Sequence, residues 1–167
     1  MRPTLALTAV ATASGLALPA CGGDEPVDAA GTYTVSLTNR ENGCNNPNWT
    51  EGETTTGIGV VITQNDTAVT ADVQPGAARI ALDLVLGSHT FVGTVDGNDL
   101  DLLITGETSF SMGTCDYTID ADIDATLSGD VLSGNIYYRA QTDGANDCGA
   151  LTGCASRQEM LGNRPPS

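Results

Sequence analysis

The sequence predicts an all-β fold, a single antiparallel up-and-down meander of about eight strands that closes into a barrel. Apolar and polar residues alternate from Gly31 to about Ala140, and segments rich in turn-forming residues separate the alternating stretches. No amphipathic helix of useful length is expected between them. Closure into a barrel removes exposed sheet edges, and a two-sheet β-sandwich is the alternative.

The predicted strands follow one another along the chain, each with one apolar face. Their apolar residues run from Tyr33 to Leu37, Ile58 to Ile62, Val69 to Val73, Ile80 to Leu86, Phe91 to Val95, Leu100 to Ile104, Tyr117 to Leu127 and Leu132 to Tyr138. In the fourth stretch, Arg79 and Asp83 alternate with the apolar residues. Short turns such as 96–98 and 128–130 contain Asp, Gly, Asn or Ser, which favour hairpins in sequence order.

The N-terminus has the features of an export signal. Arg2 precedes an uncharged apolar stretch, residues 4–18, which is too short to span a bilayer but has the length of a signal-peptide core. The stretch ends in the residues LPAC, with Cys21 last. This pattern resembles the lipobox of bacterial lipoproteins, although Pro19 replaces the usual Ala, Ser or Thr. An ordinary signal peptide cleaved near Ala20 is the alternative.

The resemblance implies that residues 1–20 are a signal peptide and that Cys21 is acylated and anchors the chain to the cell envelope. Gly22 stands where Asp would signal inner-membrane retention in similar lipoproteins, which favours the outer membrane. Residues 21–30, rich in Gly and acidic residues, are then a flexible tether. We expect the barrel domain at 31–142 and a cysteine-containing tail at 143–167.

Five cysteines occur in the chain. Lipidation of Cys21 accounts for the odd number, and the remaining cysteines, Cys44, Cys115, Cys148 and Cys154, are expected to form two disulfides in an oxidising compartment. Three pairings are open. The predicted strand order places Cys44 and Cys115 near opposite ends of the barrel, which disfavours a bond between them. The spacing of the cysteines does not match a zinc site.

Composition and motifs exclude several function classes. The formal net charge of −15 repels phosphate backbones, so we expect no nucleic-acid partner. His89 is the only histidine and is expected in an exposed turn, without the Gly-x-Ser-x-Gly motif of a hydrolase. The acidic stretch 96–101 fits a hairpin turn better than a calcium loop, because it lacks the EF-hand Gly and Glu. We therefore predict no enzyme activity, no cofactor and no metal.

The long polar connection at residues 39–56 is the strongest candidate for recognition. It contains Trp49, the single tryptophan, with Asn45, Asn46 and Asn48 beside it. An exposed Trp49 could stack on a sugar or an aromatic group. The alternative is that Trp49 caps one end of the barrel as part of its core.

The stretch GTYTVSL, residues 31–37, resembles the first strand of lipocalin-like and avidin-like barrels, with Tyr33 in place of their tryptophan. The resemblance implies a barrel and no particular activity. We expect an envelope lipoprotein that acts as a structural or protein-interaction module. The alternative is a lipocalin-like carrier of a small apolar ligand. A lumen much larger than a few waters would favour the carrier, and dense packing would favour the structural module.

Overall fold

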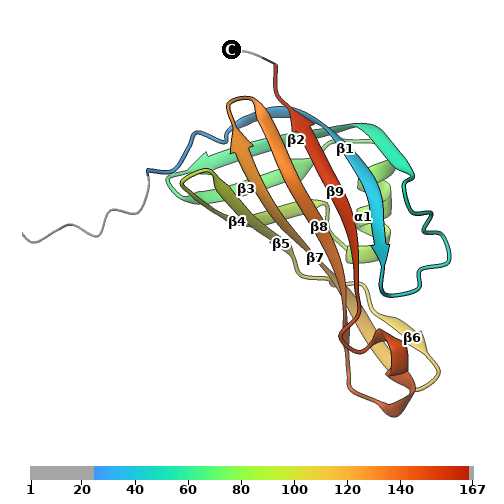
Figure 1. Ribbon diagram of the computed structural model, residues 1–167. Coiled ribbons are helices and arrows are strands. Elements are labelled where there is room, and N and C mark those ends of the chain that lie inside the picture. Colours follow the sequence, from blue (N-terminus) through green and yellow to red (C-terminus); the bar gives the residue numbers. More distant parts are fainter. Residues whose placement is uncertain (1–24, 166–167) are drawn as a thin grey trace, which may run out of the picture.

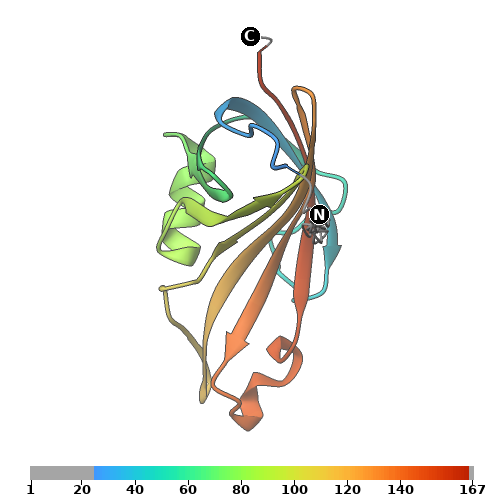
Figure 2. The ribbon, with the colours of Figure 1, turned by 90° about the vertical axis from the view of Figure 1, so that its left-hand side faces the viewer.

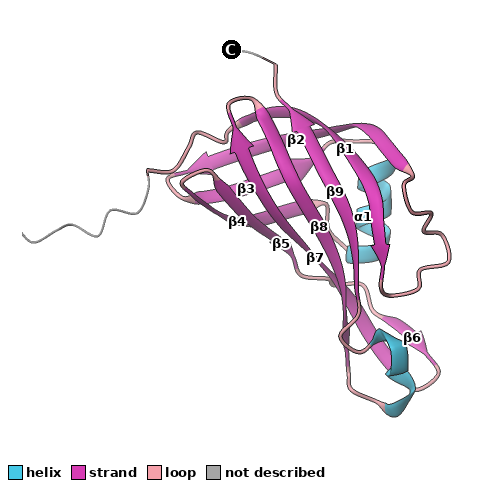
Figure 3. Ribbon diagram, viewed as in Figure 1, coloured by secondary structure: helices cyan, strands magenta, loops and turns pink. Residues whose placement is uncertain are grey.

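The computed structural model describes residues 25–165, so the predicted signal peptide and Cys21 lie outside the described residues. Strands dominate the structure (Figure 3). The elements are β1 (Gly31–Asn42), β2 (Thr54–Asn65), β3 (Ala68–Val73), α1 (Ala77–Leu86), β4 (Thr90–Asp96), β5 (Asp99–Ile104), β6 (Phe110–Met112), β7 (Cys115–Ser128), β8 (Val131–Thr142), the 3-10 helix η1 (Asn146–Leu151) and β9 (Ala155–Asn163).

All the strands except β6 form a closed antiparallel barrel, which confirms the predicted fold class (Figure 1). Most barrel neighbours are also neighbours in the chain. The barrel closes where β5 pairs with β7 and where β9 pairs with β1. The short strand β6 pairs only with β7 and extends beyond the barrel. Two separate sheets, as in the sandwich alternative, are not formed by residues 25–165.

Antiparallel order gives the barrel two distinct ends. The tight hairpins β2–β3, β4–β5 and β7–β8 lie at one end, which we call the closed end. The connections that hold α1, β6 and η1, and the long β1–β2 loop, lie at the other end, which we call the open end. Figure 2 shows α1 and η1 projecting from the barrel wall there. Short turns therefore leave one end compact, and inserted segments surround the other.

The fourth predicted strand is wrong, because Ala77–Leu86 forms helix α1. Leu82 and Leu86 are four residues apart and face inward, whereas Ile80 and Leu84 are 61% and 69% exposed. The apolar alternation in this stretch therefore belongs to two faces of a helix. Helix-favouring Ala and Leu fill the segment, and Gly87 ends it with a left-handed φ of 80°.

Residues 25–165 contain no helix that is long and apolar enough to span a membrane.

The predicted tail contains the last barrel strand. Strand β9 pairs with β8 along one edge and with β1 along the other, so the barrel domain extends to Asn163 and not to 142. Its inward residues include Ser156, Gln158 and Met160. The first two are polar, and this weakens the apolar alternation by which a strand is recognised.

The predicted flexible tether is partly ordered, because residues 27–30 cover the closed end. The backbone N–H of Val27 donates to the Gly97 carbonyl at 2.7 Å. Ala29 is fully buried, and its N–H donates to the side-chain oxygen of Gln64 at 2.7 Å. Arg164 donates to the carbonyls of Asp28 and Ala30. Residues 27–30 thus pack against the closed end of the barrel, and we call this segment the plug.

The four cysteines in the described residues form two disulfides, Cys44–Cys154 and Cys115–Cys148. The prediction of two bonds is confirmed, and so is the absence of a Cys44–Cys115 bond. The reason given for that absence is wrong, however. Cys44 and Cys115 do not lie at opposite ends of the barrel, since β1 ends and β7 begins at the same, open end. Cys44–Cys154 joins the β1–β2 loop to the start of β9, and Cys115–Cys148 joins β7 to η1.

Candidate functional site: the barrel lumen

The barrel encloses a cavity of about 710 Å³ that reaches the open end. All eight barrel strands contribute to its lining. The deep wall is apolar and is formed mainly by Val35, Ile58, Ile62, Ala71, Phe91, Leu100, Leu102, Ile123, Leu132, Ile136 and Met160. This volume falls within the range of about 300–1,000 Å³ found for small-molecule sites.

Small inward residues explain why the lumen is hollow. Ala71, Ala125 and Ala140 occupy lumen positions on three different strands. An eight-stranded barrel has just enough interior for its side chains, and short ones leave space for a ligand.

The β1–β2 loop forms one side of the mouth. Trp49 and Asn45 from the predicted recognition loop line the cavity, whereas Asn48 does not. Trp49 packs edge-on against Tyr138 with ring centroids 6.3 Å apart, and its indole N–H donates to the Arg40 carbonyl. Trp49 therefore lies half-buried at the open end of the barrel. This position agrees better with the alternative in which Trp49 caps the barrel than with a fully exposed tryptophan. The disulfide at Cys44 fixes the base of this loop.

Helix α1 forms another part of the mouth, and no sequence pattern assigned it to the site. Ala78, Ala81 and Leu82 line the cavity with one face of the helix. His89 holds the helix end in place, because its Nδ1 lies 2.7 Å from Asp83 of α1 and its Nε2 lies 3.5 Å from Asp72 of β3. His89 is thus half-buried between two carboxylates, and the expectation of an exposed turn histidine is wrong.

One wall of the mouth is polar. The Tyr138 hydroxyl donates to the side-chain oxygen of Gln158 at 2.9 Å, and the amide of Gln158 donates to Asn39 at 2.7 Å. Tyr138 and Gln158 both line the cavity. They were missed because Gln158 lies in the predicted tail and Tyr138 was expected to be an ordinary core residue. The available signal was the alternation of Ser156, Gln158 and Met160 with the residues between them in the segment that forms β9.

Tyr138 is expected to ionise only at strongly alkaline pH. Burial raises the pKa of Tyr138 from 10.0 to about 12, so folding favours the neutral phenol. This contribution to stability is complete below pH 10 and is lost as pH rises from 10 to about 12. Titration by phenolate absorbance should show a step near the upper value, and Tyr138→Phe should remove it. A step that persists in that variant would contradict this assignment.

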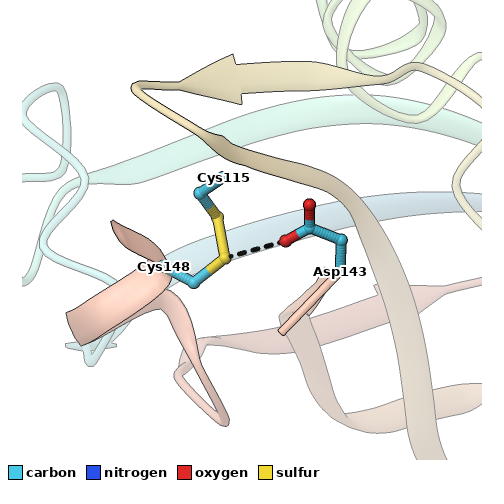
Figure 4. A group of neighbouring side chains, drawn as sticks. All are labelled: Cys115, Asp143 and Cys148. Carbon is cyan, nitrogen blue, oxygen red and sulfur yellow. Dashed lines mark hydrogen bonds between the residues drawn. A yellow bond between two sulfur atoms is a disulfide. The ribbon is translucent and has the colours of Figure 1, made fainter. Parts of the chain in front are cut away.

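The remaining titratable clusters lie outside the lumen. Cys115, Asp143 and Cys148 place three ligand-type atoms within 4.8 Å of one another (Figure 4). The two sulfurs are bonded to each other, so neither is a thiolate that could bind a metal. Asp101 and Asp124 are exposed on the outer face of the barrel. The acidic stretch 96–101 forms the β4–β5 hairpin.

Comparison with family models, with curated proteins and with solved structures finds no match to this chain.

Proposed function

We propose that this chain is an envelope lipoprotein whose barrel carries a small apolar ligand in its lumen. The observation that supports the proposal is the cavity of about 710 Å³ with an apolar wall. A structural module gains nothing from a cavity of this size, because unfilled apolar space costs stability. Occupation by an apolar ligand recovers the missing contacts.

The arrangement of the two ends fits an anchored carrier. The described chain enters at the closed end, where Val27 and Ala29 pack against the barrel. An acyl anchor at Cys21 would hold that end toward the bilayer and leave the open end, with Trp49 and α1, turned away from it. A ligand could then enter or leave without crossing the plug.

Filling the lumen with a large side chain is expected to weaken ligand binding strongly. The probe is N-phenyl-1-naphthylamine, an apolar dye whose fluorescence rises on leaving water. The unaltered domain should bind it saturably at one site. Ala125→Trp places a large ring in the lumen at a residue that is 7% exposed, and should weaken dye binding at least tenfold at a stability cost of about 1–3 kcal/mol.

Asp124→Trp is the matched control, because the neighbouring side chain on β7 is exposed on the outer face. It should leave dye binding within about twofold, since a side chain there does not reach the lumen. Equal losses in the two variants, or a domain that never binds the dye saturably, would contradict the carrier proposal.

A further inference from the structure

The polar groups that face the lumen are concentrated at the open end. Tyr138 and Gln158 lie on neighbouring strands, two residues out of register and so on the same face, since Ile136 pairs with Gln158 and Tyr138 pairs with Ser156. Ser156 is itself 3% exposed and also lines the cavity. The closed end is bounded by fully buried apolar residues such as Leu100. The lumen is therefore apolar at its base and polar on one side of its mouth.

The mouth retains unused hydrogen-bonding capacity. In the hydrogen bonds formed among residues 25–165, one N–H of Gln158 donates to Asn39, which leaves its second N–H. The Tyr138 oxygen donates its proton to Gln158 and keeps lone pairs that can accept. One donor and one acceptor thus stand beside each other at the cavity wall. A hydroxyl group, which both donates and accepts, satisfies the two together.

None of the cavity-lining residues in the described part of the chain carries a charge. A carboxylate or an ammonium group that entered this wall would lose water without gaining an opposite charge. The high pKa of Tyr138 agrees with this, because the same surroundings disfavour its own anion. A ligand with a charged head group is therefore selected against.

We infer that the lumen takes an uncharged amphiphile, its apolar body toward the closed end and a neutral hydroxyl-type head group between Tyr138 and Gln158. The inference rests on the proposed carrier function and adds the chemical class of the ligand. The apolar wall of the lumen contacts the body of the ligand. The polar side chains of Tyr138 and Gln158 bind the head group and so fix the orientation of the ligand.

Displacement of N-phenyl-1-naphthylamine by three ligands of equal chain length tests the inference. They are 1-decanol, decanoate and decylammonium, measured at pH 8 and below their micellar concentrations. We expect 1-decanol to displace the dye at concentrations at least tenfold lower than either ion, because only the ions carry an uncompensated charge into the mouth. Equal or tighter binding of either ion would overturn the inference.

Substitutions at the mouth supply the matched comparison. Tyr138→Phe should weaken 1-decanol binding about three- to tenfold, the effect of one hydrogen bond, and leave displacement by naphthalene unchanged. Tyr137→Phe, on the outer face where Arg139 lies over the ring, should change neither. Gln158→Glu keeps the shape of the side chain and should reverse the preference toward decylammonium.

The outcomes separate the two proposals. Saturable dye binding with no loss of 1-decanol affinity in Tyr138→Phe would overturn the head-group assignment and leave the carrier function standing. Absence of saturable dye binding in the unaltered domain would overturn the carrier function, and the assignment of the head group with it.

Discussion

The paired substitution of Cys44→Ala and Cys154→Ala is expected to lower the free energy of unfolding by about 4–5 kcal/mol. This disulfide joins residues 110 apart in the sequence. In the chain-entropy model, closing a loop of that length lowers the conformational entropy of the unfolded chain, and this raises the free energy of unfolding by about 4.8 kcal/mol. A domain of this size is stabilised by only about 5–15 kcal/mol, so the variant should unfold at much lower urea concentration.

Cys115→Ala with Cys148→Ala is the matched control. That disulfide spans 33 residues, for which the same model gives about 3.7 kcal/mol. Urea unfolding of both variants, followed by far-ultraviolet circular dichroism, should therefore rank the longer loop first. The opposite ranking would mean that contacts at the open end, and not loop length, decide how much each disulfide stabilises the barrel.

The barrel could be predicted from the sequence even though two of its elements were misassigned. The stretch Ile80 to Leu86 alternates like a strand, but the Ala and Leu residues of the full segment Ala77–Leu86 and the following Gly87 are helix signals that the alternation concealed. Strand β9 was missed for the opposite reason, because Ser156 and Gln158 occupy its inward positions. One false strand and one missed strand compensated, so the expected number of barrel strands was correct.

The candidate site was less accessible to sequence reasoning. A cavity depends on the sum of many side-chain volumes around a closed ring, and no single position such as Ala125 reveals it. The partnership of Tyr138 and Gln158 depends on the register between β8 and β9, which only the closed barrel fixes. Trp49, expected as a candidate recognition residue because a long loop carries it, does line the cavity, and its role in recognition stays a prediction.

Tyr33→Ala is expected to cost about 3–5 kcal/mol, the range for removing a fully buried aromatic ring. Tyr33 has no exposed surface and stands at the closed end, where the guanidinium of Arg164 lies 5.9 Å from the ring centroid. Its hydroxyl donates to the Ala29 carbonyl at 3.0 Å and so holds the plug on the barrel. Alanine would leave a cavity beneath the plug and release that contact.

Tyr33→Phe separates the ring from the hydroxyl. Phenylalanine keeps the packing and loses one hydrogen bond, so we expect a cost of about 1 kcal/mol in the same urea experiment. Burial also raises the pKa of Tyr33, so the folded state favours its neutral form and stability should fall as pH rises above 10. Equal costs for the two variants would show that attachment of the plug through the hydroxyl, and not filling of the closed end by the ring, is what Tyr33 contributes.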